Sequence, residues 1–531
     1  MRWSVVFIAA AAAFLITSSY GYRILVFSPA NSRSHMISNG RIADELAKAG
    51  HEVILFEPEY LPIGAVVNSA KHATRYTVGG FSDNFAKCVE GLSTFEKNSI
   101  WEMVSKYNRF QEAFTDACEE MLNMKPVIEK LKSYNFDIFF GEQLNLCGTG
   151  LAHVLNIKTH IWISSCPLMD HMDQILGSPK PLSYVPAVGD LDISDKPTYL
   201  ERLENIVTWV GDVYTYRYGS RLINQLFRKK FGHDFPDVDD LARESPLVFV
   251  STDEFLDFPR PILPNIIHIG GLGINTNSTE LKEPFKSEMK KGKNGAVYFS
   301  FGSNVKTSPL PLSFKQNLFE SFKLFPDYHF IVKIEKEDLE SENLGKQLPN
   351  VFLTNWAPQT DLLSAPELKA FITHGGYNSL METAIHAVPV IAFPFFCDQY
   401  RNARVAQRNG WGISINRETL AASERPLVEA LTKILNVPSY QENAKRVQKL
   451  VLTKPFKSAE KLVKYTEFVA DNDGRLPELQ IEGRHLGFVQ YHNLDIILPA
   501  VGVVLVVIYG FVRVVFGIMR VVMKPRKEKS A

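Results

Sequence analysis

The sequence predicts an α/β fold with two Rossmann-like domains in series that face each other across a cleft, followed by one C-terminal transmembrane helix. Three observations predict it. Short apolar strands alternate with helical patterns from residue 23 onward. The alternation stops in a stretch rich in Pro, Gly and charge and then resumes. Residues 496–512 form a run of 17 residues without a charge.

The first domain is predicted at residues 22–256. It opens with a β-rich run at 23–27, a loop of Pro, Asn and Ser, a helical pattern that Gly50 ends, and a strand at 52–56. This β-loop-α-β order starts a parallel sheet. Residues 100–133 are predicted to be helical, and "FDIFFGEQ" and "KTHIWISSC" are predicted to be later strands.

A linker is predicted at residues 257–294, and the second domain at 295–475. Predicted strands are "GAVYFSFGS", "YHFIVKI", "NVFLTNW", "LKAFITH" and "VPVIAFPF", and predicted helices are 313–324, 379–387 and 398–409. Ligands of such sheets bind outside the carboxyl ends of the strands. The loops that matter most therefore follow Phe301, Asn355, His374 and Phe395.

The two ends of the chain predict a membrane protein. Arg2, an apolar run and small residues at Ser19 and Gly21 predict a signal peptide at 1–21. A juxtamembrane segment at 476–495 precedes a predicted span at 496–519; a buried core helix is the alternative. The tail at 520–531 is basic, with Lys524, Arg526, Lys527 and Lys529, so it is expected on the cytosolic side.

The tail also resembles the K-x-K-x-x retrieval signal of the endoplasmic reticulum, with a generic basic stop-transfer tail as the alternative. We therefore expect a single-pass type I protein of that membrane, with its two domains in the lumen. Asn277 begins a glycosylation sequon in a polar stretch, as expected of a glycoprotein.

Composition excludes several classes. The 58 basic and 58 acidic side chains balance, which argues against nucleic acid as a partner. The five cysteines have neither metal-site spacing nor the density of a disulfide framework, although one disulfide in the N-terminal half is compatible with them. No G-x-G-x-x-G or Walker motif is present, so neither a nicotinamide dehydrogenase nor a P-loop nucleotidase is supported.

The loops after the strands of the second domain suit a nucleotide sugar. Gly302-Ser303 and His374-Gly375-Gly376 offer backbone amides and a helix N-terminus to a diphosphate. Trp356 offers a plane on which a base can stack, and Asp398-Gln399 offers a carboxylate and an amide to sugar hydroxyls.

These residues carry a family resemblance. "FITHGGYNSLMETAIHAVPVIAFPFFCDQ" (371–399) resembles the donor-binding signature of the UDP-glycosyltransferases, and "NWAPQTDLL" and "YRNARVAQRNGWG" beside it are similar to that family. With both chain ends included, the resemblance covers essentially the whole chain. It is to the animal membrane-bound UDP-glucuronosyltransferases, and it implies the two-domain GT-B fold.

The resemblance also implies residue roles. Trp356 would stack on uracil, with Gln359 near the nucleoside, and Glu382 would bind the ribose hydroxyls. Asp398 and Gln399 would bind the transferred sugar. The diphosphate would contact Ser303, His374, Gly376, Asn378 and Ser379. Neither a metal nor a cofactor is expected, since the UDP-sugar is a co-substrate.

Each of these residues has a structural alternative. Ser379 and Glu382 fit a capping box that starts a helix. Trp356 fits an ordinary core, His374 a buried structural histidine, and Asp398 a helix N-cap.

His35, in "SPANSRSHM", matches the position of the family's catalytic base in the first β-α loop. The family's partner is an Asp after the strand "FDIFFGEQ", where this chain has Glu142; Asp137 lies five residues earlier and is expected to face away. We predict that Glu142 orients His35. The alternative is that His35 acts without a carboxylate.

The predicted reaction is an inverting transfer of glucuronate from UDP-glucuronate to a small lipophilic acceptor, as in conjugation and detoxification. Lys333, Arg401 and Arg404 are candidate cations for the glucuronate carboxylate. The alternatives are a glucose donor, a silent UDP-sugar-binding protein and an epimerase. Homo-oligomerisation is left open.

Overall fold

The computed structural model describes residues 21–90, 95–96, 99–274, 280–303 and 305–523. It divides into a unit at residues 1–480 and a C-terminal unit at 481–531. The signal peptide up to residue 20, Asn277 of the sequon and the basic residues from Lys524 onward lie outside the described residues.

The first sheet of the larger unit has seven parallel strands in the order β3-β2-β1-β4-β5-β6-β7. The strands are β1 (Arg23–Phe27), β2 (Glu52–Pro58), β3 (Thr74–Val78), β4 (Ile138–Glu142), β5 (Thr159–Ser164), β6 (Val248–Val250) and β7 (Ile266–His268). β1, β4 and β5 are buried along almost their whole length, as parallel strands covered on both faces should be.

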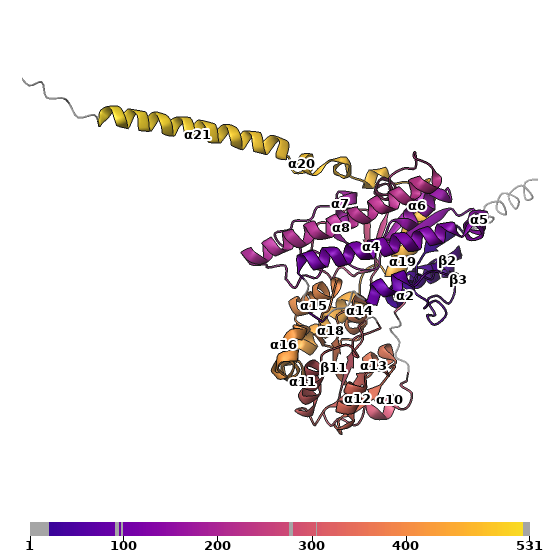
Figure 1. Ribbon diagram of the computed structural model, residues 1–531. Coiled ribbons are helices and arrows are strands. Elements are labelled where there is room, and N and C mark those ends of the chain that lie inside the picture. The colour runs from indigo at the N-terminus through magenta and orange to yellow at the C-terminus, as the bar shows by residue number, and fades with distance from the viewer. Residues whose placement is uncertain (1–20, 91–94, 97–98, 275–279, 304, 524–531) are drawn as a thin grey trace, which may run out of the picture. The chain divides into compact units, whose positions relative to one another are not determined.

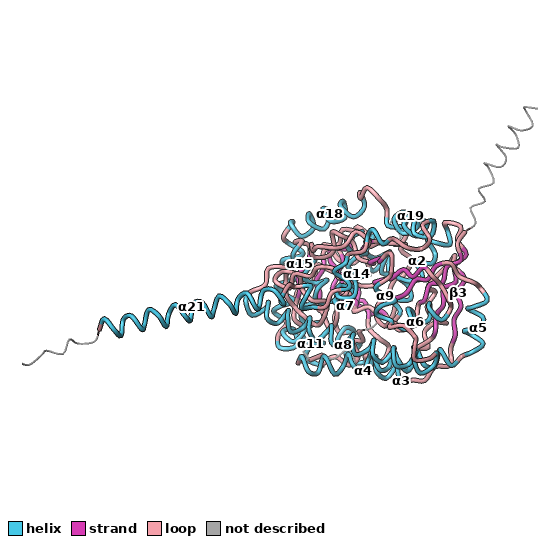
Figure 2. Tube along the Cα trace, turned by 90° about the horizontal axis from the view of Figure 1, so that it is seen from above, coloured by secondary structure: helices cyan, strands magenta, loops and turns pink. Residues whose placement is uncertain are grey.

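Helices cover both faces of this sheet, with α19 on one side of the strands and α4 on the other (Figure 2). They are α2 (Arg33–Lys48), α3 (Asn84–Glu90), α4 (Ile100–Asn123), α5 (Lys125–Ser133), α6 (Cys147–Val154), α7 (Asp170–Leu176), α8 (Tyr199–Phe231) and α9 (Val238–Arg243). The single helix predicted at 100–133 is two helices, because Pro126 takes an early position of α5 and Met124 leaves helical geometry.

The second sheet has six parallel strands in the order β10-β9-β8-β11-β12-β13. They are β8 (Ala296–Ser300), β9 (His329–Lys333), β10 (Val351–Thr354), β11 (Leu368–Thr373), β12 (Val390–Ala392) and β13 (Gly412–Ser414). Its helices are α10 (Phe285–Glu288), α11 (Leu312–Lys323), α12 (Leu339–Lys346), α13 (Gln359–Ser364), α14 (Tyr377–Ile385), α15 (Asp398–Arg408), α16 (Arg417–Ala422), α17 (Arg425–Asn436) and α18 (Pro438–Leu452).

The predicted domain boundaries need two corrections. The predicted linker at 257–294 contains β7, which pairs with β6 as the edge strand of the first sheet. Helix α19 (Ser458–Asp471), predicted in the second domain, returns to the first one. There Leu462 and Val469 join the core of the first sheet, and α19 lies among the violet elements in Figure 1.

Each sheet reverses its strand order at one place, and this positions the site. The reversal falls between β1 and β4 in the first sheet and between β8 and β11 in the second. A crevice opens at such a point beyond the carboxyl ends of the two strands, and ligands bind there.

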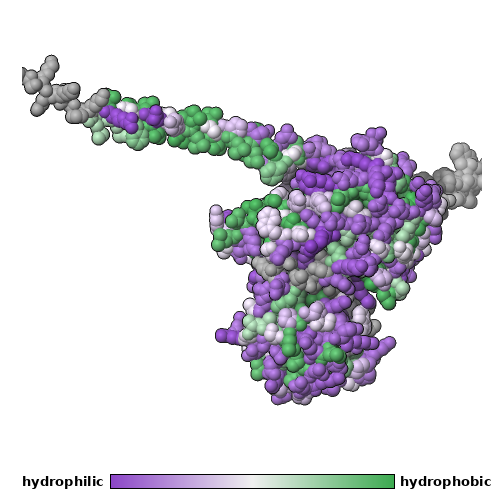
Figure 3. Space-filling model, in the orientation of Figure 1, coloured by the Kyte–Doolittle hydropathy of each residue, from purple (hydrophilic) through white to green (hydrophobic). Residues whose placement is uncertain are grey.

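The C-terminal unit contains the short helices η2 (Glu482–His485) and α20 (Phe488–Tyr491) and the long helix α21 (Leu494–Val522); η1 (Pro477–Leu479) precedes it. Helix α21 has 29 residues and a mean hydropathy of 2.5 in its most apolar window, and none of that window is buried. Hydrophobic residues run along it in Figure 3. It is longer than the predicted 496–519, and it could span a membrane.

Candidate active site

His35 and Glu142 meet at the reversal point of the first sheet. Glu142 is the last residue of β4, and His35 lies in the first turn of α2, the helix that follows β1. Ser32 caps that helix and accepts a hydrogen bond from the His35 backbone N–H at 3.3 Å. The imidazole Nδ1 lies 2.8 Å from Glu142 Oε1. The two residues that the sequence pairs as base and partner therefore contact each other directly.

Glu142 makes His35 a stronger base. Burial acts to lower the pKa of His35, but the charge of Glu142, its hydrogen bond and the charge of Asp398 raise it above the ordinary value. The side chain of Glu142 is buried, so its charge acts through little water. Asp398 is the first residue of α15 in the second domain. Its effect on the pKa of His35 therefore means that a charge of the second domain lies near the base of the first.

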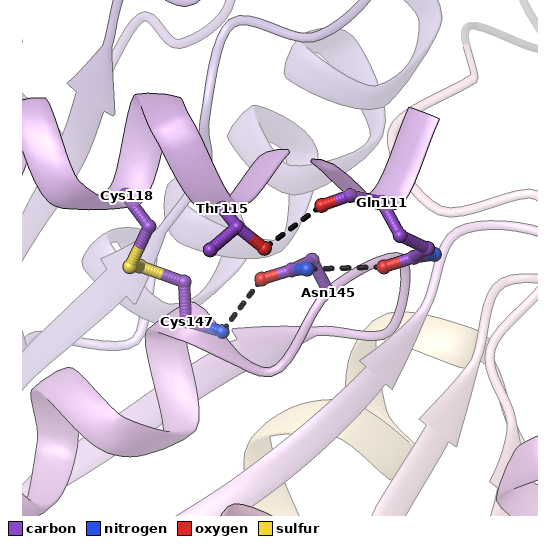
Figure 4. The surroundings of a disulfide bond; sticks show 5 residues. All are labelled: Gln111, Thr115, Cys118, Asn145 and Cys147. Carbon is purple, nitrogen blue, oxygen red and sulfur yellow. Dashed lines mark hydrogen bonds between the residues drawn. A yellow bond between two sulfur atoms is a disulfide. The ribbon is translucent and has the colours of Figure 1, made fainter. Parts of the chain in front are cut away.

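A disulfide supports the loop that follows Glu142. Cys118 of α4 is bonded to Cys147 at the start of α6, so the single disulfide compatible with the sequence is present. Asn145 donates to Gln111 Oε1 at 3.1 Å and accepts from Cys147 N at 2.9 Å (Figure 4). These bonds attach the 143–146 loop to α4 and leave Glu142 little freedom to move away from His35.

The other imidazole nitrogen, Nε2, faces Cys166, whose Sγ lies 4.0 Å away. Burial raises the pKa of the Cys166 thiol well above its ordinary range, so the group stays neutral. An acceptor hydroxyl has to reach His35 on this side, because Glu142 occupies the opposite nitrogen.

A cavity of about 190 Å³ lies near the dyad in the first domain. Gln143 and Asn145, one and three residues after Glu142, line it together with His171, Tyr216 and several charged side chains. The His171 and Tyr216 rings stack with their centroids 3.6 Å apart. Amides and rings thus line this space together, so hydrogen bonding as well as apolar contact is available to an occupant.

His374 lies at the reversal point of the second sheet, directly after β11, and Gly302-Ser303 follows the neighbouring strand β8. Two glycines make room for the imidazole. A Cβ on Gly302 would lie 2.7 Å from the His374 ring, and a Cβ on Gly376 would lie 2.6 Å from it. Burial, with the charge of Lys333, lowers the pKa of His374 to about 4, so the ring is neutral near pH 7.

Helix α14 begins directly beyond this ring, and it settles the capping-box alternative. Gly376 is its N-cap, without a side-chain cap, and Asn378 and Ser379 lie in its first turn. The capping-box reading of Ser379 and Glu382 is therefore wrong, because the helix has already begun at Tyr377. The amides of the first turn face the crevice at the end of β11, which is the geometry of an anion site.

Gln359, Ser379 and Glu382 form one polar cluster. Gln359 Nε2 donates to Glu382 Oε2 at 2.9 Å and to Ser379 Oγ at 3.2 Å. Burial raises the pKa of Glu382, although the Gln359 hydrogen bond and the charge of Arg41 act against it. Trp356, by contrast, is 58% exposed, so it is not an ordinary core residue.

Asp398 and Gln399 open α15; Gln399 is buried and Asp398 is partly buried. Asp398 accepts a hydrogen bond from Asn402 at 2.9 Å, and Asn402 also donates to the Gly375 carbonyl at 3.0 Å. Gln399 Oε1 accepts from the Phe395 and Phe396 amides at 2.9 and 3.3 Å. The N-cap is Cys397, so Asp398 is the first helical residue rather than the cap.

The candidate cations for a glucuronate carboxylate have other partners. Arg401 pairs with Asp257 at 2.7 Å, and Arg404 pairs with Asp192 through two bonds of 2.6 and 2.9 Å. Lys333 donates to the Gly302 carbonyl.

Several residues at this site escape sequence reasoning. Arg33 lies over the Trp356 ring, and Asp190 accepts a hydrogen bond from the Cys397 amide. Asp190 and Asp192 alternate with buried Leu191 and Ile193 in "GDLDISD", a pattern that marks one face toward solvent or a partner, and Asp195 follows after Ser194. The partner, α15, lies about 200 residues away, and no local signal identifies it.

Two parallel-sheet Rossmann-like domains, each with a crevice at the carboxyl ends of its strands, are the architecture of the GT-B fold. Solved structures agree. A "Glycotransferase of kitacinnamycin" aligns with a TM-score of 0.58 at 20% identity, over 85% of this chain and 99% of that one. The "glycosyltransferase SnogD from Streptomyces nogalater" aligns at 0.57 and 16%, over 84% and 99%.

The chain belongs to the family described as "UDP-glucoronosyl and UDP-glucosyl transferase", which it matches over residues 23–529. It is 45% identical over 493 residues to the "Putative UDP-glucuronosyltransferase ugt-48" of Caenorhabditis elegans, covering 92% of this chain and 93% of the relative. It is 27% identical over 544 residues to the human "UDP-glucuronosyltransferase 2B17", covering 100% and 99%.

Proposed function

We propose that this glycosyltransferase moves glucuronate from UDP-glucuronate to a hydroxyl of a small lipophilic acceptor, with inversion at the anomeric carbon. The observation that carries the proposal is the His35–Glu142 hydrogen bond of 2.8 Å, which lies close enough to Asp398 for its charge to raise the His35 pKa. The general base His35 comes from the first domain, and the loop that carries Asp398 comes from the second.

The donor is bound by the second domain. Trp356 stacks on uracil, and Gln359 and Glu382 bind the nucleoside, with Glu382 on the ribose hydroxyls. Ser303, His374, Gly376, Asn378 and Ser379 hold the diphosphate. The neutral His374 ring contributes a hydrogen bond rather than a charge, since its pKa is about 4.

The transfer is one displacement. His35 Nε2 takes the acceptor proton as the acceptor oxygen forms a bond to the anomeric carbon, and the bond from that carbon to the UDP oxygen breaks. Glu142 stabilises the imidazolium that forms, as the acid of a hydrolase triad does. The helix dipole of α14 stabilises the negative charge on the departing UDP. Attack opposite the leaving group converts an α-linked donor to a β-linked product.

The sugar is the open part of the proposal. Because Arg401 and Arg404 are paired, the structure also favours a second candidate, a glucose donor. One further cation lies near the Asp398 loop: Lys106 of α4 interacts electrostatically with Asp190, which accepts a hydrogen bond from the Cys397 amide. Its ammonium nitrogen has no hydrogen-bond partner among the described residues. A buried, unpaired ammonium is costly, and a glucuronate carboxylate would satisfy it.

The test compares UDP-glucuronate with UDP-glucose over a panel of phenols, using the full-length protein in microsomes, with the conjugate identified by mass. We expect glucuronides of β configuration, and their loss in His35→Ala with UDP binding intact. Glucosides would assign the second candidate. Conversion of the donor into another UDP-sugar without acceptor would indicate an epimerase, UDP release without acceptor would indicate a hydrolase, and UDP binding without any turnover would indicate a silent protein.

We further propose that the protein lies in the endoplasmic reticulum membrane as a single-pass type I protein with both domains in the lumen. The candidate span α21 and the basic residues after it support this orientation. Protease added to sealed microsomes should remove only the short C-terminal tail. Digestion of the catalytic domains in sealed vesicles would contradict it.

A further inference from the structure

Trp356 of the second domain contacts Arg33 of the first domain. The guanidinium carbon of Arg33 lies 4.6 Å from the centroid of its ring, within the distance of a cation–π contact. Arg33 is the first residue of α2, and 323 positions separate it from Trp356. The indole is otherwise largely exposed.

Arg33 also lies close to the proposed diphosphate site. Burial lowers the pKa of Lys333, and the charge of Arg33 acts in the same direction. Lys333 in turn donates to Gly302 beside the His374 ring. Two turns further along α2, Arg41 interacts electrostatically with Glu382. Helix α2 of the first domain therefore approaches the second domain at two places. Arg33 lies over Trp356, and Arg41 interacts with Glu382.

We propose that Arg33 is a donor-binding residue supplied by the first domain. Uracil lies between two side chains, with Trp356 against one face of the base and the Arg33 guanidinium against the other. The proposal rests on the proposed UDP-sugar donor. Bases stack well on aromatic side chains and on guanidinium planes. The long Arg33 side chain has enough freedom to move away from the indole by the thickness of one base, and its planar guanidinium can stack on that base.

The stack has a consequence for catalysis. Arg33 and His35 share the first turn of α2, which the Ser32 cap holds. A base bound between Arg33 and Trp356 therefore links the turn that carries His35 to the second domain. Arg33 acts on the proton transfer only through this placement, so it is a positioning residue for His35 and a binding residue for the base.

The test measures competitive inhibition of the full-length enzyme by uridine and by UDP. We expect Arg33→Ala to weaken both about tenfold, the size of one cation–π contact, and Arg33→Lys to lose less. The KM for the donor should rise by a similar factor, while the KM for the acceptor stays the same. Lys48→Ala, at the exposed end of the same helix, is the matched control and should change neither inhibitor.

The outcomes separate the explanations. A loss for UDP with uridine unchanged would place Arg33 on the phosphates and overturn the stack. Tighter binding in Arg33→Ala would mean that Arg33 competes with uracil for Trp356, which also overturns it. If wild-type enzyme binds neither UDP nor uridine, the proposed donor itself is wrong, and no Arg33 variant is needed to show it.

Discussion

At the scale of single residues, Glu142 reaches His35 at a position where the family resemblance implies an Asp. Its charge raises the pKa of His35, while burial acts to lower it. A general base works only when deprotonated, so the acidic limb of kcat/KM should follow the pKa of His35. We expect Glu142→Gln to lower kcat by at least about a hundredfold. It should also move that limb to lower pH, because the charge that raises the pKa is gone. A pH–rate profile measures both effects.

Asp137 provides the matched carboxylate control. It lies at the start of the same strand, and it accepts a hydrogen bond from the Arg23 backbone N–H at 2.8 Å, away from His35. Asp137→Asn should therefore leave the acidic limb in place. If Glu142→Gln kept both the wild-type rate and the wild-type limb, His35 would act without a carboxylate.

A substitution at Gly376 that only crowds the His374 ring can test the proposed diphosphate site. The φ of −61° at Gly376 is open to any residue, but an added Cβ would lie 2.6 Å from His374 Nε2. Gly376→Ala should therefore displace the ring without straining the backbone, and it should raise the KM for the donor at least about tenfold, the loss of one charge-assisted hydrogen bond. Combined with His374→Ala the change should add little, because both act through one ring. Full additivity in this double-mutant cycle would show that Gly376→Ala does not act through the His374 ring.

At the scale of elements, α15 joins the domains through a row of arginines on one face. Arg401, Arg404 and Arg408 pair with Asp257, Asp192 and Asp195, and their side chains are 1%, 28% and 38% exposed. Ion pairs matter more as burial removes water. We expect Arg401→Ala to cost about 3–5 kcal/mol because it leaves Asp257 buried and unpaired. Arg408→Ala should cost less than about 1 kcal/mol.

Thermal unfolding of the solubilised protein measures this gradient. Arg425→Ala breaks an exposed pair on α17 and serves as the control, with no measurable shift in Tm expected. Equal losses for Arg401→Ala and Arg408→Ala would contradict the dependence on burial.

The sequence predicts elements better than it predicts their contacts. Nine of the thirteen strands that the structure describes are predicted as apolar runs, because parallel strands are mostly buried on both faces, whereas β3, β6, β7 and β13 are missed. Helix α14 begins two residues before its predicted start, because the glycine that caps it leaves no side-chain signal. The edge strand of the first sheet, β7, is only three residues long. It lies within a Pro-rich stretch that propensity indicates to be a linker. Tertiary pairing overrides local pattern there.

The residues of the site divide in the same way, into those that strand order places and those that only tertiary contacts place. His35 and His374 follow strands and Glu142 ends one, and strand order alone brings them to the crevices. Arg33 and the three aspartates of "GDLDISD" join the site through partners that lie about 200 residues or more away. No periodicity or motif encodes such a contact, so only the folded chain reveals it.

At the scale of the whole molecule, the first domain is completed by residues from beyond the second. Leu462, Val469 and Leu476 are buried in the core of the first sheet, and Ser458 Oγ donates to the Gly270 carbonyl at 2.7 Å. Three buried side chains contribute roughly 5–9 kcal/mol, which is comparable with the entire stability of a typical domain. The two domains therefore cannot be separated by cutting the chain between them.

This arrangement predicts where the chain can be shortened. A chain that ends at Gln480 keeps α19 and the unit at residues 1–480, so it should fold, unfold cooperatively and bind UDP as the full protein does. A chain that ends at Pro455 keeps every strand of both sheets but lacks α19, and it should lose UDP binding and the cooperative transition. Calorimetry and UDP titration on both chains measure the difference. If the chain ending at Pro455 melted at the same temperature and bound UDP equally well, α19 would be an accessory rather than part of the first domain.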